Sequence, residues 1–214
     1  MTPAGAEPGP TIDIDSVVAT GRGDDGTTGL LYGGERIRKD DLRTEAYGTI
    51  DEAVAALGLA RAHLAGLPDL AALILRFQRE LFVAGAELAT NPDAWDRLAD
   101  DVTRVSATMV RGVEAVLVDF EARIVMPREF VVPGETAASS ALEVARTVLR
   151  RAERRAVSLA AAGLVPGDHL VRSLNRLADL LWVLARAAEQ AESRTATPSR
   201  ASRAARTDRT TAKK

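Results

Sequence analysis

The sequence predicts an all-α protein, a bundle of about five helices, and three observations lead there. Hydrophobic residues make up 46% of the 214 residues but aromatic residues only 4%. The core must therefore consist mostly of Leu, Val and Ala, as in helical bundles. Apolar residues also recur at helical spacing through most of the chain after residue 40. We find no parallel-sheet pattern and no internal repeat.

Composition excludes several classes of protein. The chain has no cysteine, which rules out disulfides, thiolate nucleophiles and cysteine-based metal sites. No apolar run reaches the length of a transmembrane helix, and the first ten residues, MTPAGAEPGP, do not have the pattern of a signal peptide. We expect a cytoplasmic protein with no membrane partner.

The two ends of the chain differ from its middle. Residues 1–16 are expected to form a flexible lead, and residues 17–190 a single helical domain. The tail, residues 191–214, holds seven Lys or Arg and two Asp or Glu, a net charge of +5, and no large apolar residue. Such a tail is expected to be disordered. A solubilising role is favoured over nucleic-acid binding, because the tail has no aromatic residue and no patterned spacing.

The first two helices have clear start and stop signals. The first is expected to begin near Asp40 and Asp41, both good N-caps, and to stop before Gly66. The second is expected to begin at Pro68, a favoured first position, and to end at 91–92. Their core-facing residues are Ala46, Ile50, Ala53, Leu57 and Leu64, then Leu70, Leu73, Phe77, Leu81 and Leu88.

Three further helices are expected from periodicity. They run from about Val102 to Ala122, from near Ala137 to Ala162 with Gly163 as the stop, and from near Pro166 to Gln190. Their core-facing residues are Val102, Val105, Met109, Val113, Val116 and Phe120, then Leu142, Ala145, Leu149, Ala152 and Ala156, then Leu170, Leu174, Leu177, Leu181 and Ala188.

A glycine-rich segment, TGRGDDGTTGL from residue 20 to residue 30, precedes the helices. Gly21, Gly23 and Gly26 match a dinucleotide-binding pattern, but no helix follows as that pattern requires. The spacing of Gly21 and Gly26 is that of a P-loop, but Thr27 stands where the lysine should be. Two readings remain: a loop that binds phosphate through backbone N–H groups, or an ordinary glycine-rich turn.

Two helices carry polar faces away from the core. Arg146, Arg150 and Glu153 share one face of the fourth helix, with Arg154 beside them. The plain interpretation is a solvated basic face, but arginines at this spacing repel each other unless an anion is near. On the fifth helix a tryptophan stands within a polar line, which suggests that the face is covered. The line is Asn175, Asp179, Trp182 and Arg186.

The first helix adds glycines to the face opposite its core, at Gly48 and Gly58. Each costs roughly 1 kcal/mol relative to alanine and makes sense where another helix approaches closely. A single bundle cannot easily cover three such faces. A homo-oligomer with its site at the subunit interface can.

Four blocks together resemble the ATP:cob(I)alamin adenosyltransferase family of the propanediol-utilisation type, in its order and spacing from about 19 to 188. The blocks are TGRGDDGTTGL, RKDDLRTEAYGTIDEAVAALGLARA, FVVPGETAASSALEVARTVLRRAERR and LNRLADLLWVLAR. The resemblance implies a ferritin-like five-helix bundle that forms a homotrimer with active sites between subunits. It implies transfer of the 5′-deoxyadenosyl group of ATP to the cobalt of a reduced corrinoid, such as cob(I)alamin or a cobyrinic acid derivative, with release of triphosphate.

The resemblance also implies roles for single residues. Lys39 and Arg150 match the catalytic phosphate contacts, and Phe130 the phenylalanine pressed under the corrin. Asp51 and Arg146 resemble a salt-bridged pair across the interface, so loss of Asp51 is expected to leave Arg146 buried without a partner. The full ATP-binding set is Thr20, Gly21, Arg22, Gly23, Thr28, Lys39, Arg150, Arg151, Glu153, Arg154 and Asn175.

Cofactors and partners follow from the same resemblance. Mg²⁺ is expected on the ATP phosphates and not on metal ligands of the protein. A reductase would supply the electron, and an adenosylcobalamin-dependent mutase would use the product.

The chain departs from the family pattern at three places. The loop lysine is absent, and we hypothesise that Arg22, one residue later, takes its contact. The sequence Pro133-Gly134-Glu135 replaces the usual P-G-G, and Glu143 replaces a histidine. The missing lysine keeps an alternative open, a non-catalytic relative that binds corrinoid and ATP or delivers cobalamin; the intact arginine block argues against it.

Overall fold

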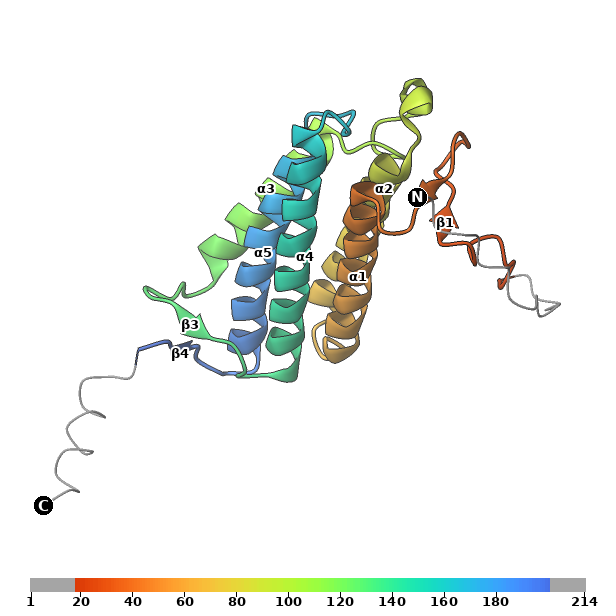
Figure 1. Ribbon diagram of the computed structural model, residues 1–214. Coiled ribbons are helices and arrows are strands. Elements are labelled where there is room, and N and C mark those ends of the chain that lie inside the picture. Colours follow the sequence, from red (N-terminus) through yellow and green to blue (C-terminus); the bar gives the residue numbers. More distant parts are fainter. Residues whose placement is uncertain (1–17, 201–214) are drawn as a thin grey trace, which may run out of the picture.

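The computed structural model describes residues 18–200 (Figure 1). Expectations for residues 1–16, and for the tail from 201 onwards, lie outside the described residues. Nearly all regular structure in the described part is α-helical, which confirms the all-α prediction. Along the same residues, no helix combines the length and the apolar character that crossing a membrane would require.

The five α-helices follow one another with two very small ribbons at the margins. The helices are α1 Leu42–His63, α2 Pro68–Ala89, α3 Ala107–Arg123, α4 Ala137–Ala161 and α5 Leu170–Ala191. A 3₁₀-helix, Pro92–Arg97, follows α2. One ribbon pairs β1 Thr27–Thr28 with β2 Ile37–Arg38, and the other pairs β3 Val131–Val132 with β4 Thr197–Pro198, both antiparallel.

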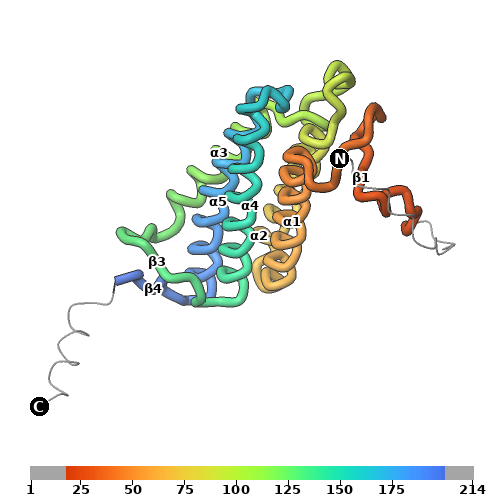
Figure 2. The backbone as a smooth tube through the Cα atoms, viewed as in Figure 1, coloured from red at the N-terminus to blue at the C-terminus, as the bar shows by residue number. Residues whose placement is uncertain are grey.

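The helices pack side by side around one continuous core. α1 lies between α2 and α4, α4 also packs on α5, and α3 packs on α5 (Figures 1 and 2). All five contribute to the core, and the predicted core residues of α1, α4 and α5 are buried. Leu73, Val116 and Phe120 pack against this core only in part.

Helix ends follow local capping chemistry. The Asp41 side chain accepts a hydrogen bond from the Arg43 N–H at 2.8 Å, as expected of an N-cap. Gly163, with φ of +70°, ends α4 in the left-handed conformation that glycine tolerates best. Arg43 is buried and donates to the carbonyls of Leu88 at 3.0 Å and Thr90 at 3.2 Å. It thereby satisfies acceptors at the end of α2 that would otherwise be orphaned.

Two predicted helix starts are wrong. Val102 is 66% exposed in a turn, and α3 begins only after Ser106, whose hydroxyl caps the N–H groups of Thr108 and Met109. The apolar spacing of Val102 and Val105 continued the helical period by chance into this turn. α5 begins at Leu170, four residues later than Pro166.

The expected tail also differs in its first part. β4 pairs with β3, and the Ser199 N–H donates to the Phe130 carbonyl at 2.7 Å. The Gln190 amide meets both backbone groups of Val125, at 2.9 and 2.8 Å. Residues 197–199 are therefore attached to the loop between α3 and α4, because backbone pairing does not need the large apolar residues that this segment lacks.

Candidate active site

A cleft of about 990 Å³ opens between α3, α4, α5 and the loop that carries β3. Arg146 and Arg150 of α4 line it with Asp179 and Trp182 of α5. Phe130 lines it from the loop and is 88% exposed. The cleft thus brings together Arg146, Arg150 and Phe130, for which the resemblance implied an interface role, a phosphate contact and a corrin contact. A hollow with both cationic and aromatic lining is suited to a large ligand with polar and apolar parts.

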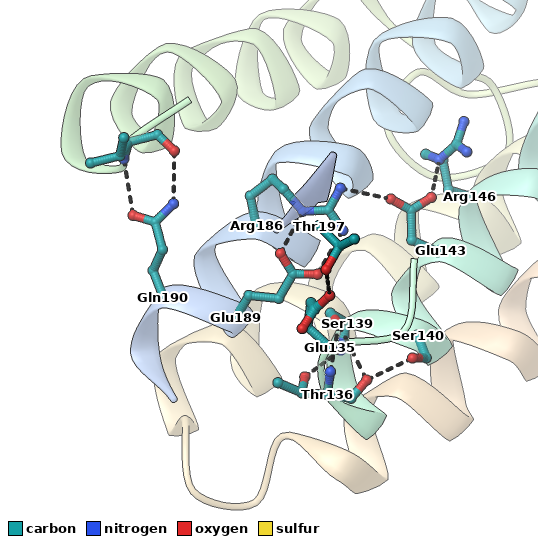
Figure 3. A network of polar contacts seen from close by, with 11 residues as sticks. Glu135, Thr136, Ser139, Ser140, Glu143, Arg146, Arg186, Glu189, Gln190 and Thr197 are labelled. Carbon is teal, nitrogen blue, oxygen red and sulfur yellow. Dashed lines mark hydrogen bonds and ion pairs between the residues drawn. The ribbon is translucent and has the colours of Figure 1, made fainter. Parts of the chain in front are cut away.

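A charge network that sequence reasoning missed begins at Glu143 and Arg146, which line the cleft, and continues to buried Arg186 and Glu189 (Figure 3). Glu143 Oε2 accepts from Arg146 Nε at 2.7 Å, and Glu143 Oε1 lies 3.2 Å from Arg186 Nη1. Arg186 also holds Glu189 through two hydrogen bonds of 2.8 Å each. Its guanidinium carbon lies 5.5 Å from the centre of the Trp182 ring. The network therefore connects Arg146, on the α4 side of the cleft, with Arg186, which lies beside Trp182 on α5.

This network changes the expectation for Arg146. Its partner within the chain is Glu143 on the same helix, while Asp51 lies exposed on α1. Loss of Asp51 would not leave Arg146 unpaired, so that expectation is wrong. The pairing of Asp51 with Arg146 across two subunits stays a prediction.

The nucleotide-binding candidates of α4 and α5 divide between two sides. Asn175 Nδ2 donates to Glu153 Oε1 at 3.1 Å, so these two candidates are neighbours. Arg154 donates to the Arg150 carbonyl at 3.1 Å and stays on the same side. Arg151 instead forms an ion pair with Glu52 of α1. The four candidates Arg150, Arg151, Glu153 and Arg154 all lie on α4, but Arg151 is directed to α1 and away from the side of Arg150 and Glu153.

The glycine-rich loop meets Lys39. A side-chain carbon at Gly23 would lie only 2.8 Å from Lys39 Nζ, so the space beside Gly23 is filled by the ammonium group. Gly21 and Gly26 have φ of +69° and +78°, which other residues adopt only with strain. Thr20 and Arg22 are exposed, and Thr28 is half-buried in β1. Lys39 therefore places an ammonium group beside this lysine-less loop.

The loop also holds a carboxylate. Asp25 accepts from the Thr27 hydroxyl at 2.7 Å and from the Thr27 N–H at 2.9 Å. These hydrogen bonds lower the pKa of Asp25 below its ordinary value, with a smaller contribution from Arg36.

The site candidates form two groups that one chain does not unite. Neither the loop nor Lys39 lines the cleft. The β1 ribbon extends beyond α1 and α2, whereas β3 lies near α3 and α5 on the other side (Figures 1 and 2). The cleft is lined by α3, α4, α5 and the loop that carries β3. Each chain therefore carries two separate groups of candidate residues, the loop with Lys39 and the cleft, which are candidate half-sites.

Comparison with known proteins shows the family. The family model for cobalamin adenosyltransferase matches residues 18–188. A corrinoid adenosyltransferase of Citrobacter freundii is 39% identical, covering 80% of this chain and 94% of its own length. One of Bacillus subtilis is also 39% identical, covering 78% and 83%. This chain therefore belongs to the cobalamin adenosyltransferase family, and the resemblance carried by the four sequence blocks is confirmed.

Solved structures narrow the likeness within that family to the PduO type. A phenylalanine-to-alanine variant of the PduO-type ATP:corrinoid adenosyltransferase of Lactobacillus reuteri, complexed with cobalamin and ATP, is similar with a TM-score of 0.78. It is 28% identical, and the match covers 86% of this chain and 99% of that one. An arginine-to-lysine variant complexed with ATP has a TM-score of 0.76 at 28% identity, covering 85% and 99%.

Proposed function

We propose that this chain is a corrinoid adenosyltransferase that moves the 5′-deoxyadenosyl group of ATP to the cobalt of a reduced corrinoid and releases triphosphate. The observation that carries this proposal is the cleft in which Arg146 and Arg150 face Phe130 and Trp182, in a chain of this family. The aromatic residues provide a surface for a corrin ring, and the arginines provide donors for phosphate.

The chemistry needs little from the protein beyond placement. The cobalt of the reduced corrinoid is itself the nucleophile: its electron pair forms the cobalt–carbon bond with the ribose 5′ carbon. The bond from that carbon to the phosphate oxygen breaks, and triphosphate leaves with the bonding pair. Holding cobalt and carbon in line converts a slow encounter into a reaction within one complex.

The second task of the protein is to neutralise the negative charge that builds up on the departing triphosphate. We assign it to Lys39 and Arg150, whose contacts accelerate the reaction only if they are stronger in the transition state than in bound ATP. Within residues 18–200, no group of three or more Asp, Glu or His side chains could hold a metal ion. We propose that Mg²⁺ is held by the phosphates, as the family resemblance implies, and that it helps to neutralise their charge.

The two half-sites support a homotrimer in which the loop and Lys39 of one subunit face the cleft of the next. Large apolar side chains that are about half exposed or more support such packing. They include Leu59 of α1, Phe82 of α2, and Val144 and Val157 of α4. We further place the enzyme in the cytoplasm, with a reductase that supplies the electron and an adenosylcobalamin-dependent mutase that uses the product.

One anaerobic experiment tests the function. Wild-type protein with ATP, Mg²⁺ and reduced cobalamin should change the corrinoid spectrum and release one triphosphate per cobalamin. Arg150→Ala should lower the rate at least tenfold, since loss of a charge-assisted hydrogen bond costs about 1.5–3 kcal/mol. Arg111→Ala, on the exposed side of α3, is the matched control and should keep the wild-type rate. Binding of both ligands without triphosphate release would favour the non-catalytic alternative.

A further inference from the structure

One side chain that sequence reasoning did not single out, Arg36, joins the two ends of the glycine-rich loop. Its Nη2 donates to the carbonyl of Arg22 at 2.6 Å and to the carbonyl of Thr27 at 3.0 Å. Its Nε donates to the Thr27 hydroxyl at 2.7 Å. A single guanidinium from the residue before β2 therefore bridges Arg22 and Thr27 within the glycine-rich segment. The planar fork of arginine suits this role, because it offers several donors in fixed directions.

The end of the loop is also held by the backbone: the Lys39 N–H donates to the Gly26 carbonyl at 2.9 Å, and Thr27–Thr28 pair with β2. The backbone hydrogen bonds at its start are short-range, so Arg36 supplies the longer tie to residue 22. The Asp24 N–H donates to the Gly21 carbonyl at 3.1 Å, and the Gly26 N–H donates to the Gly23 carbonyl at 3.1 Å. No residue of the loop between 20 and 28 belongs to the hydrophobic core. A glycine-rich backbone loses much conformational entropy when it is ordered, so a tie across its ends has a large effect on its shape.

Arg36 also offsets an unfavourable charge. Its Nη2 lies 4.0 Å from Asp25 Oδ1, the same oxygen that accepts from Thr27. A free carboxylate in a loop that receives phosphates would repel them. The contacts of Asp25 with Thr27 and Arg36 keep its charge paired inside the loop.

We propose that Arg36 is a positioning residue for the nucleotide. It holds residues 22–27 in the shape in which Gly23 lies against Lys39 Nζ, and thereby sets the affinity of the loop for the ATP triphosphate. The proposal rests on the proposed function, because it takes ATP as the ligand of this loop.

The test is equilibrium binding of ATP with Mg²⁺, measured by calorimetry without corrinoid. Arg36→Gln should weaken ATP binding about tenfold, with unchanged corrinoid affinity and melting temperature. Turnover should show a raised KM for ATP with a nearly unchanged kcat at saturating ATP, since Arg36 acts through the loop. Arg38→Gln is the matched control: it removes the same charge two residues away, and within residues 18–200 the Arg38 side chain pairs with exposed Asp40 and no other side chain. It should bind ATP within twofold of wild type.

Arg36→Lys separates geometry from charge. Lysine keeps the positive charge but cannot span the three acceptors, so most of the loss should remain. Full recovery by lysine, an equal loss in Arg38→Gln, or wild-type affinity in Arg36→Gln would each overturn the positioning role. Wild-type protein that binds no ATP would overturn the proposed function together with it, whereas the other three outcomes leave that function standing.

Discussion

Arg186 lies at the centre of the buried network, and replacing it is expected to cost more stability than replacing any exposed arginine. Its side chain is 1% exposed and lies between Glu143, 5% exposed, and Glu189, 1% exposed (Figure 3). Arg186→Met keeps most of the side-chain volume but leaves two buried carboxylates with one cation, Arg146, at the margin. Removing one partner of a buried ion pair costs about 3–5 kcal/mol, because the remaining charge is left desolvated.

The expected loss of stability can be measured as a decrease in the melting temperature. For a domain of this size, 1 kcal/mol corresponds to about 2–4 °C, so Arg186→Met should melt about 6–20 °C below wild type in a calorimetric scan. Arg172→Met is the control on the same helix. Arg172 is 58% exposed and contacts Glu114 at the surface, so its loss should hardly move the transition.

A triple variant in which the two carboxylates are also neutralised tests this reasoning. When Glu143→Gln and Glu189→Gln are added to Arg186→Met, no carboxylate of the network remains to be left unpaired, and much of the stability should return. Two results would refute this reasoning: a melting temperature of Arg186→Met equal to that of wild type, or a triple variant that is no more stable than the single variant. In either case the buried charges would not stabilise one another as inferred from their positions.

Two further predictions concern a titrating core residue and the cleft. Burial raises the pKa of Glu87 to about 7, so wild type loses stability as pH rises from about 4.5 through 7, a total of about 3 kcal/mol. Glu87→Gln should therefore melt above wild type at pH 8, with the difference narrowing to about 1 kcal/mol at pH 5; a difference independent of pH would contradict this assignment. Phe130→Ala should slow adenosylation of cobalamin much more than that of a corrinoid without the lower nucleotide, and equal losses in the two initial rates would mean that the ring only packs.

The sequence predicted the buried residues correctly in the helices where apolar residues recur at helical spacing. The buried rows of α1, α4 and α5 follow directly from Leu and Ala at helical spacing. It failed at the start of α3, where Val102 and Val105 continue the period by coincidence. The signal that could have corrected this is Ser106, an N-cap residue with its side chain bonded to two following N–H groups.

The candidate site was predictable only in its separate pieces. Arg186 had been placed with Asn175 on a polar line that was expected to be covered. Arg186 is buried, but Asp179 of the same line is exposed, so the chain itself covers that face only at Arg186. Its pairing with Glu143, however, depends on how α4 packs against α5, which no local pattern specifies. The pairing of β4 with β3 was missed for the same reason, because two-residue strands have no periodicity to detect.

The position of the glycines links the fold to the proposed site. Gly58 has the Gln78 amide 3.3 Å from the place of a side-chain carbon, so α2 explains it within one chain. Gly48 has nothing within 4 Å of that place, and Gly21 and Gly26 lie in a loop outside the core. A residue that costs stability without a neighbour in its own chain is best explained by a neighbour in another. Gly21 and Gly26 are explained within the chain by their positive φ. Gly48 is not, and it fits the proposed homotrimer, in which a second subunit would pack on the side of α1 and the loop with Lys39 would complete the cleft of that subunit.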